Sequence, residues 1–321
     1  MDMREAQDRY PTRIERRPKP FERLDPVVYS QGSTQRDGPL SEAQLRDYDD
    51  QGFLFFKSFF SPEEMQGFVD DLQDYDRDTE LKKKDQVIIE PHTDEIRSIF
   101  AIHELSRRFD RLTRDPRLLD MAHQILGSEV YIHQSRINDK PGFTGTGFNW
   151  HSDFETWHSE DGMPQPRCFS VSILLSENNQ FNGPLMLIPG SHRWFVPTGG
   201  QTPQEHWKSS LKNQTVGVPT PDVLHRLIDK HGLAAPQGPA GSVVIFESNV
   251  LHASANNLSP WPRRNLFFVY NSVANQAVDP FCGQPPRPEF AATRGEVEPL
   301  RRLQSNAGAQ QGQPLAASFK H

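Results

Sequence analysis

The hydrophobic and polar positions of the first 130 residues predict three helices and one buried strand. Ser41 and Ser61 each stand three residues before a Gln or Glu, which is the capping-box pattern of a helix N-terminus, and a proline follows Ser61 at the first helical position. A third helix is expected to begin after Asp115 and to end at Gly127. The apolar run at 53–56 lies between the first two helices and is typical of a buried strand.

From residue 130 onward the pattern changes to short apolar runs separated by Gly, Pro and Asn, which indicates β-strands joined by turns. The expected strands cover residues 130–139, 168–176, 184–189, 242–248 and 265–273. Helices followed by a series of strands favour a mainly β protein with flanking helices. Its core is expected to be a double-stranded β-helix of the jelly-roll or cupin type.

The first of these strands carries a row of polar residues. Gln134, Arg136, Asn138 and Lys140 share one parity and therefore one face of the strand. Such a face either meets solvent, with the core on the opposite side, or lines the interior of a ligand-filled barrel. The metal motif described below favours the interior.

The chain is expected to divide into a central domain and two flanks. Residues 1–38 are rich in Arg, Pro, Asp and Gln without a clear period, which indicates an extended or disordered arm. Residues 39–303 are expected to form one double-stranded β-helix domain with a helical flank. Within it, residues 199–240 interrupt the strands as a lid-like insertion. The low-complexity tail at 304–321 is expected to be disordered.

Composition narrows the choice of compartment and partners. The formal net charge of −7 argues against nucleic acid or an anionic membrane as a partner. The two cysteines, Cys168 and Cys282, form neither a zinc motif nor a disulfide framework, which fits a reducing compartment. The N-terminal residues lack the apolar segment of a signal peptide, and no stretch approaches the ~18 apolar residues of a membrane span. We therefore expect a cytoplasmic protein.

The most informative chemistry lies at His151-Ser152-Asp153, which places an imidazole and a carboxylate two residues apart. On a strand, this spacing puts both side chains on one face. With a distant second histidine they would complete the 2-His-1-carboxylate triad of a non-haem iron(II) site. That triad leaves coordination positions open for a 2-oxo acid and O2.

The triplet alone is weak evidence, because the sequence holds three His-x-acid triplets, at His92, His151 and His158. An oxygenase of this type also needs a distal histidine and, beyond it, a basic residue that holds the far carboxylate of the 2-oxo acid. Among the histidines after Asp153, only His252 follows a strand-like run and is itself followed, 11 and 12 residues later, by the arginines at positions 263 and 264. His252 is therefore the expected third ligand.

The region from about Val130 to Arg294 resembles ectoine hydroxylases, a branch of the phytanoyl-CoA dioxygenase-like iron(II)/2-oxoglutarate oxygenases. The likeness rests on the segments FNWHSDFETWHSEDGMP and SVSILLSENNQFNGPLMLIPGSH, with YIHQSRIN before them and RPEF after them. It implies hydroxylation of L-ectoine to 5-hydroxyectoine with Fe(II), O2 and 2-oxoglutarate, and release of succinate and CO2. It also implies a cytoplasmic homodimer that serves compatible-solute synthesis under osmotic stress.

Carried over residue by residue, the resemblance implies three groups of site residues. The iron ligands would be His151, Asp153 and His252. The residues that hold 2-oxoglutarate would be Lys140 and Arg263, with Ser170 and Asn138 as helpers. The residues around ectoine would be Gln134, Trp157, Phe246, Phe267 and Arg287.

The chemistry of ectoine fits these residue types. Its ring carries a delocalised cation, which the aromatic faces of Trp157 and Phe267 could hold by cation–π contacts. Its carboxylate could pair with Arg287. From sequence alone, Trp157 could equally be a core residue, Phe267 in NLFFVY is more typical of core, and Arg287 could be an exposed loop residue.

Two other functions compete with ectoine hydroxylation. A related oxygenase could act on another small zwitterion such as a free amino acid, and residues 134, 157 and 287 discriminate between the two. A cupin-like binding protein without turnover is disfavoured, because the triad and the arginine for the 2-oxo acid are both present. A halogenase is disfavoured because Asp153 occupies the place that halide would need.

Overall fold

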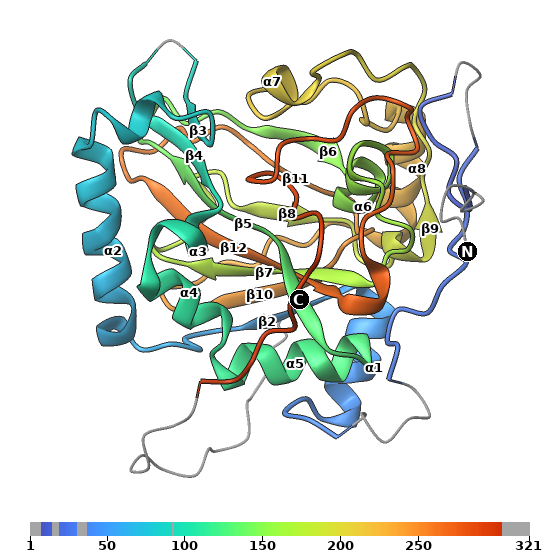
Figure 1. Ribbon diagram of the computed structural model, residues 1–321, viewed down its shortest axis with the longest axis horizontal. Helices are drawn as coiled ribbons and strands as arrows, with labels where there is room; N and C mark the ends of the chain where they lie inside the picture. Colours follow the sequence, from blue (N-terminus) through green and yellow to red (C-terminus); the bar gives the residue numbers. More distant parts are fainter. Residues whose placement is uncertain (1–7, 15–18, 31–36, 92, 304–321) are drawn as a thin grey trace.

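The computed structural model describes residues 8–14, 19–30, 37–91 and 93–303 (Figure 1). Two antiparallel sheets form its centre. The larger has seven strands in the order β2-β10-β7-β12-β5-β4-β3, and the smaller has three in the order β6-β11-β8. The larger sheet consists of β2 (Phe53–Phe56), β3 (Val87–Ile89), β4 (Ile96–Phe100), β5 (Val130–Lys140), β7 (Cys168–Leu174), β10 (Val243–Glu247) and β12 (Arg263–Ser272).

The smaller sheet consists of β6 (Phe148–His151), β8 (Leu185–Leu187) and β11 (His252–Ser254). It packs on the larger sheet through an apolar cluster that joins Leu185 and Leu187 to Phe246 and Phe267. This arrangement is the mainly β, cupin-like core with flanking helices that the sequence predicts. The two sheets are hydrogen-bonded separately, however, so they face each other as a sandwich and do not close into a barrel.

All five strands predicted after residue 130 are present, with ends that differ by a few residues. Of the strands in the part of the chain that the structure describes, six were not predicted from the sequence: β1 (Phe21–Glu22), β3, β4, β6, β9 (Trp194–Phe195) and β11. Two of them, the very short β6 and β11, carry the two histidines of the expected triad. Each is too short to show a period of its own. Their pairing across the small sheet, and not their sequence, makes them strands.

The predicted helix starts are confirmed. Ser41 and Ser61 close capping boxes at the N-termini of α1 (Glu42–Gln51) and α2 (Pro62–Arg77). Asp115 caps α5 (Pro116–Leu126), which ends at Gly127. Two short helices, α3 (Ile102–Leu105) and α4 (Arg107–Thr113), were not predicted.

Helices α1, α4 and α5 lie along the outer face of the larger sheet, where Figure 1 shows them below and beside β2, β10 and β7. The main apolar cluster joins residues of these helices to the strands, for example Leu118 and Ile125 of α5 to Val171 and Phe268. This burial fixes one face of the sheet as core. The opposite face, called the inner face below, is turned toward the smaller sheet.

A β-bulge decides which residues of β5 reach the inner face. The pairing with β12 runs from Lys140 to Gln134, then skips His133 and resumes at Ile132. Because of this skip, both Ile132 and Ile137 pack into the main apolar cluster although their parity differs. The polar row predicted on one face of this strand does face inward: Gln134 and Lys140 are 6% and 0% exposed.

The regions outside the sheets pack on the domain at several points. In the expected lid-like insertion at 199–240, α8 (Pro221–His231) packs beside Leu251, and α7 (Trp207–Ser210) packs near Phe100. In the expected arm, β1 (Phe21–Glu22) pairs with β9 (Trp194–Phe195). The expected disordered tail lies outside the described residues, and the division into arm, domain, lid and tail stays a prediction.

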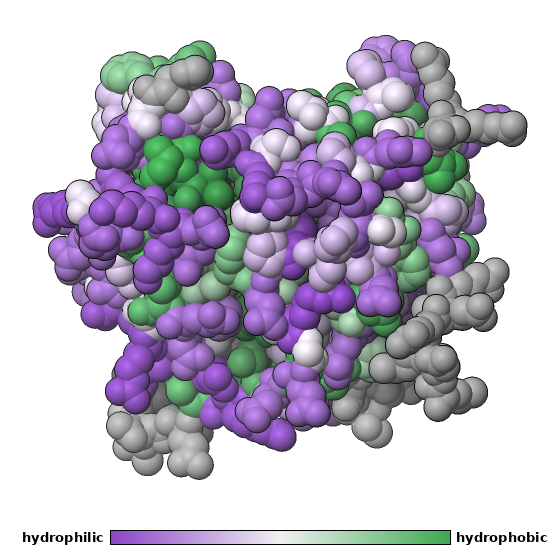
Figure 2. Space-filling model, turned by 45° about the horizontal axis from the view of Figure 1, so that its top comes forward, coloured by the Kyte–Doolittle hydropathy of each residue, from purple (hydrophilic) through white to green (hydrophobic). Residues whose placement is uncertain are grey.

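The face shown in Figure 2 is mostly hydrophilic, with separate hydrophobic patches between charged side chains. Among the described residues, every helix is too short or too polar to cross a membrane.

Candidate metal centre

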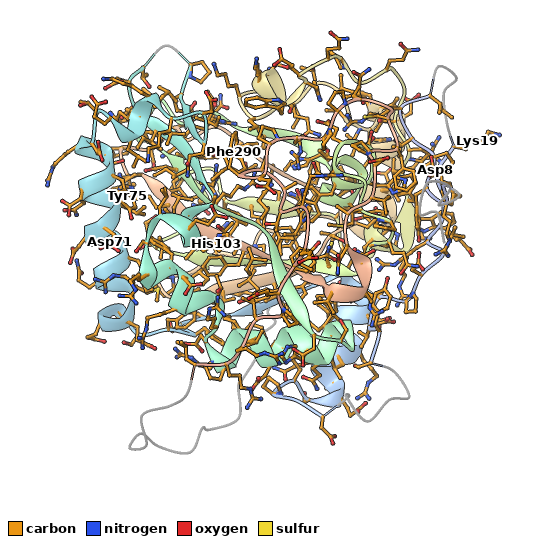
Figure 3. All side chains as sticks on the ribbon, in the orientation of Figure 1. Asp8, Lys19, Asp71, Tyr75, His103 and Phe290 are labelled. Atoms are coloured by element: carbon orange, nitrogen blue, oxygen red, sulfur yellow. The ribbon has the colours of Figure 1, made fainter. Side chains whose placement is uncertain are left out.

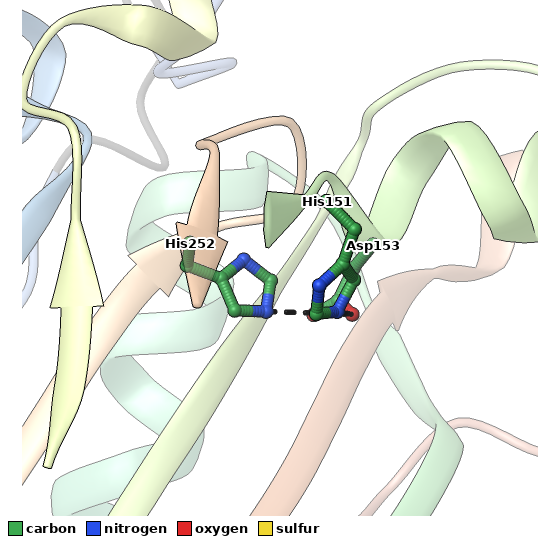
Figure 4. Close-up of side chains that lie close together, drawn as sticks. All are labelled: His151, Asp153 and His252. Atoms are coloured by element: carbon green, nitrogen blue, oxygen red, sulfur yellow. Dashed lines mark ion pairs between the residues drawn. The ribbon is translucent and has the colours of Figure 1, made fainter. Parts of the chain in front are cut away.

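Strand pairing brings the two expected histidine ligands together. His151 ends β6 and His252 begins β11, and the two are direct cross-strand partners. Their ring centroids are 4.2 Å apart, and Figure 4 shows both rings turned toward the carboxylate of Asp153. The Nε2 atoms of His151 and His252 lie 3.6 and 3.8 Å from Asp153 Oδ1. One ligand atom of each residue lies within 4.8 Å of the others, which suits a single metal ion.

Asp153 lies beside the two histidines as predicted, but it belongs to a helix and not to the predicted strand. The strand ends at His151, and Asp153 is the first residue of the short helix α6 (Asp153–Thr156). Ser152 makes this change of direction by capping the helix, accepting the backbone N–H of Glu155 at 3.3 Å. The carboxylate therefore reaches the histidines from a helix start and not from a shared strand face.

Hydrogen bonds select the tautomer of each ring. His151 Nδ1 lies 2.7 Å from the carbonyl oxygen of Asn149, and His252 Nδ1 lies 3.1 Å from that of Val250. A carbonyl oxygen can only accept, so each Nδ1 carries a hydrogen and each Nε2 lone pair points to the centre. This is the tautomer that binds a metal through Nε2.

The electrostatics favour the protonation states that metal ligands need. Burial lowers the pKa of His252 to about 4, assisted by the neighbouring ring of His151. For Asp153, burial alone would raise the pKa, but His252 and His151 outweigh it and hold the pKa below its ordinary value. At neutral pH the centre therefore offers a neutral imidazole from His252 and a carboxylate from Asp153.

A group of cations lies on the inner face beyond the triad. Lys140 and Arg263 are cross-strand partners at the end of β5 and β12, and strand parity turns Arg263 inward while Arg264 turns outward to Asp76. The Nη2 atom of Arg263 donates to Asn138 Oδ1 at 2.6 Å. Arg263 and Asn138 both line a cavity that also contains His151 and His252. The arginine expected from sequence is therefore at the metal centre, and Arg264 is not.

The cations of this group have no carboxylate partner among the described residues. Lys140 Nζ donates to Ser254 Oγ at 2.8 Å and to the carbonyl oxygen of Ala255, which are neutral groups. The buried Nε of Arg263 has no hydrogen-bond partner. Burial, with Arg263 as the next cause, lowers the pKa of Lys140 to about 5. Arg263 keeps a spare donor, and the Lys140 amine beside it would take up a proton when an anion binds, so the two residues can hold a carboxylate such as that of 2-oxoglutarate.

Arg136 belongs to the same cavity and was not assigned a role from the sequence. It lines the cavity with Phe148 and Phe267, and its guanidinium lies 5.1 Å from the centre of the Phe267 ring. No hydrogen bond or ion pair of Arg136 occurs within the described ranges. Its shared parity with Asn138 and Lys140 was the signal that could have identified it.

The structure places two of the aromatic residues expected around the substrate beside the triad. Phe267 lines the cavity, and the Phe246 ring lies 5.1 Å from the His252 ring and 6.4 Å from the Phe267 ring. Ser170, expected near 2-oxoglutarate, instead contacts the metal ligand set: its hydroxyl is 3.4 Å from Asp153 Oδ2. All of these side chains share the inner face.

The other three expected substrate residues lie together toward the opposite end of β5. Gln134 Nε2 donates to the carbonyl oxygen of Ala291 at 2.6 Å, and the Trp157 ring lies edge-on to the His133 ring at 5.3 Å. Arg287 makes a buried bidentate ion pair with Asp161, at 2.7 and 2.5 Å. Arg287 is therefore not a loop residue in solvent, and any bond it makes to a substrate must be shared with Asp161.

Comparison with known proteins agrees with this geometry. The family model of phytanoyl-CoA dioxygenase (PhyH) matches residues 48–265. The ectoine dioxygenase of Bordetella bronchiseptica is 49% identical over 94% of this chain and 97% of its own length. That of Halomonas elongata is 51% identical over 90% of this chain and 87% of its own length.

This chain belongs to the ectoine dioxygenase family. The resemblance drawn from the sequence motifs is thereby confirmed, and it extends well beyond the region that carried them. The match with the Bordetella bronchiseptica protein includes 300 residues of this chain.

Solved structures of a family member have the same fold. EctD from S. alaskensis in its apo form superposes with a TM-score of 0.82 at 43% identity, over 92% of this chain and 98% of that one. The same protein has been solved with bound Fe, and with 2-oxoglutarate and 5-hydroxyectoine, each at a TM-score of 0.81. The more distant carbocyclase SnoK, at 18% identity and a TM-score of 0.59, shares the fold.

Proposed function

We propose that this chain hydroxylates L-ectoine to 5-hydroxyectoine with Fe(II), 2-oxoglutarate and O2, and that it releases succinate and CO2. The observation that carries the proposal is the cavity lined by both sheets. His151 and His252 of the smaller sheet face Arg136 and Arg263 of the larger sheet across it, and Asp153 completes the triad beside it. The chain also aligns over 92% of its length with an EctD structure holding 2-oxoglutarate and 5-hydroxyectoine.

His151, Asp153 and His252 hold Fe(II) in this proposal. Their mixed imidazole and carboxylate donors suit this ion, and the carboxylate offsets part of its charge. Bound iron supplies the O2 chemistry that no side chain can perform. The protein keeps both rings in the Nε2-donor tautomer through the carbonyl groups of Asn149 and Val250.

Arg263 and Lys140 hold the carboxylate of 2-oxoglutarate that does not bind iron. The planar guanidinium of Arg263 suits a bidentate pair, while Lys140 adds a point charge. Asn138 orients Arg263 through the bond at 2.6 Å. Arg136 completes the cavity wall, and Ser170 lies next to the Asp153 carboxylate.

Gln134, Trp157, Phe246, Phe267 and Arg287 enclose ectoine in this proposal. The face of Phe267 or Trp157 takes the delocalised cation of the ring, a contact worth about 0.5–2 kcal/mol. Arg287 takes the substrate carboxylate while it keeps part of its pair with Asp161. The substrate is thereby held next to the metal with water excluded from the cavity.

A turnover assay tests the reaction. Protein loaded anaerobically with Fe(II) is mixed with 2-oxoglutarate, O2 and L-ectoine, and products are identified by NMR. We expect 5-hydroxyectoine and succinate in equal amounts. Free proline or lysine, offered in parallel, should give neither product at comparable rate. Faster hydroxylation of a free amino acid would overturn the ectoine assignment and leave the oxygenase class.

Binding measurements test the substrate residues separately. Calorimetry with an inert divalent metal and 2-oxoglutarate should show ectoine binding that Arg287→Ala weakens by roughly 30-fold or more, because removing one partner of a desolvated charge pair costs about 2–5 kcal/mol. Iron and 2-oxoglutarate binding should be unchanged. Normal ectoine binding by this variant would remove Arg287 from the substrate site.

The cellular role follows from the same proposal. The enzyme works as a homodimer in the cytoplasm and contributes to compatible-solute synthesis under osmotic stress. Sedimentation velocity would give a mass twice that of the chain, and a monomer at micromolar concentration would contradict the dimer.

A further inference from the structure

Arg13 belongs to the N-terminal arm, but its side chain is buried against the segment that begins with Asp153. Its guanidinium donates to both carboxylate oxygens of Glu155, from Nε at 3.1 Å and from Nη2 at 3.0 Å. Its Nη1 donates to Glu160 Oε1 at 2.5 Å. Both carboxylates lie on the continuous turns formed by α6 and the π-helical turn η3 (Trp157–Asp161). The arm therefore holds this segment from its outer side.

Glu155 does not make the side-chain hydrogen bond of a capping box, because its carboxylate contacts Arg13 instead. The spacing of Ser152 and Glu155 is that of a capping box, and in α1 and α2 the corresponding Gln44 and Glu64 side chains accept the backbone N–H of the cap residue. Glu155 gives only its backbone N–H to Ser152, and its carboxylate turns away to Arg13. The long-range ion pair replaces the bond that this spacing ordinarily makes.

The same two carboxylates hold a third segment. Thr198 donates to Glu155 Oε1 at 2.8 Å, and His206 Nδ1 lies 2.8 Å from Glu160 Oε1. We call the set of Arg13, Glu155, Glu160, Thr198 and His206 the arm cluster. It joins the arm, the helix that carries Asp153 and the start of the insertion, three segments that are far apart in the sequence.

The backbone at Arg13 is strained in a way that serves this contact. Its φ of 55° lies in the left-handed region, which a side chain other than glycine adopts only when its surroundings enforce it. The Arg13 N–H is held by the carbonyl oxygen of Thr198 at 2.8 Å. A second residue of the arm contacts the same segment: Asp8 Oδ1 lies 2.9 Å from His158 Nε2. Figure 3 shows Asp8 at the edge of the molecule.

We infer that Arg13 is a positioning residue for the metal centre: by holding Glu155 and Glu160 it fixes α6 in the orientation that presents the Asp153 carboxylate to the metal. The inference rests on the metal role proposed above for Asp153. It does not depend on which substrate is hydroxylated.

The physical reason is the short length of α6. A helix of four residues cannot hold its own orientation, so bonds from outside must do so. On the inner side, the Phe154 N–H donates to the carbonyl oxygen of Ser248 at 2.9 Å. On the outer side, Arg13 is the cation that balances both Glu155 and Glu160. Without it the buried Glu155 carboxylate loses its ion-pair partner and Glu160 keeps its contact with His206, so the start of the segment must shift to reach water or another cation.

The test compares three full-length variants. Arg13→Gln removes the cation, and Arg13→Lys keeps a charge but not the three-way fork. Tyr10→Phe is the matched control. It removes a bond within the arm, from the Tyr10 hydroxyl to Asp25 at 2.6 Å, and leaves the arm cluster intact. Fe(II) affinity is measured by anaerobic titration in the presence of 2-oxoglutarate, following the visible charge-transfer band of the iron–2-oxoglutarate complex.

We expect Arg13→Gln to bind Fe(II) about 10–100-fold more weakly, the usual cost of removing a group that orients a metal ligand, and to shift the charge-transfer band. Arg13→Lys should recover part of the affinity, and Tyr10→Phe should match the unaltered protein. If Arg13→Gln does not fold, Thr198→Val removes one partner of Glu155 and should give a smaller change in the same direction.

Two results would overturn the inference. The first is an Arg13→Gln variant with lower thermal stability but unchanged iron affinity and spectrum, since that shows a structural role alone. The second is an equal loss of affinity in Tyr10→Phe, since that shows a general effect of the arm. Failure of the unaltered protein to hydroxylate ectoine would count against the proposed substrate only, because the readout is the metal complex.

Discussion

Two groups of cations in and around the metal centre differ in their partners. The paired group consists of Arg13 and Arg287, which bind the carboxylates of Glu155, Glu160 and Asp161 at 2.5–3.1 Å. The unpaired group consists of Lys140, Arg263 and Arg136, whose described partners are neutral oxygens and aromatic rings.

This difference in partners indicates the role of each group. A buried charge without a counter-ion costs several kcal/mol, so a protein retains one only where something else supplies the opposite charge. The paired group has its counter-ions within the chain and therefore fixes structure. The unpaired group lacks them, which is the arrangement expected of a site completed by a dianion.

The largest expected effect is at the triad itself. His252→Ala removes one of three ligands, so turnover should be abolished and the iron content should fall sharply, while the fold remains. Iron is measured by elemental analysis and folding by circular dichroism. His225→Ala, at an exposed position on α8, is the control and should behave normally. A near-normal iron content in His252→Ala would contradict the assignment of the triad, and with it the relation of both cation groups to the metal.

The next effect tests the paired group. Arg287→Ala leaves Asp161 buried without its bidentate partner, so the free energy of unfolding should fall by about 3–5 kcal/mol. Arg263→Gln should lower it much less, because no carboxylate loses its ion-pair partner. Urea unfolding of both variants measures the difference. Equal losses in the two variants would erase the distinction between paired and unpaired cations.

The role of the unpaired group is tested through the affinity for its proposed ligand, 2-oxoglutarate. Arg263→Lys should raise the KM for 2-oxoglutarate tenfold or more, since losing a hydrogen bond to a charged group costs about 1.5–3 kcal/mol. Steady-state kinetics at saturating ectoine measure it. Arg264→Lys is the matched control, because Arg264 faces outward to Asp76. Impairment of the control alone would move the role to the neighbouring residue.

The smallest effect comes from a cation that is paired but exposed. Arg193 contacts Asp49 and Asp50 at 2.7 and 2.9 Å, with 45% of its side chain exposed. Arg193→Ala should change the free energy of unfolding by about 1 kcal/mol or less, because water screens such pairs. The same urea experiment measures it. A loss as large as that of Arg287→Ala would mean that pairing, and not burial, determines how much such a cation contributes to the free energy of unfolding.

The sequence alone determined the features that depend on local spacing. Capping boxes at Ser41 and Ser61 set helix starts, and turn residues separated the strands after residue 130. The His-x-Asp triplet with a later His and Arg selected His151, Asp153 and His252. These patterns are readable because each depends on neighbours along the chain or on a small set of rare residue types.

Only the tertiary structure decided the features that depend on register. The skip at His133 separates Ile132 from the inward row that begins at Gln134 and turns this isoleucine to the core, and the pairing of His151 with His252 closes the triad. The pair of Arg287 with Asp161 and the contact of Arg13 with Glu155 join residues more than a hundred positions apart. No local pattern encodes such pairs, because their partners are chosen by how the two sheets and the arm pack, and charge complementarity then stabilises what packing has brought together.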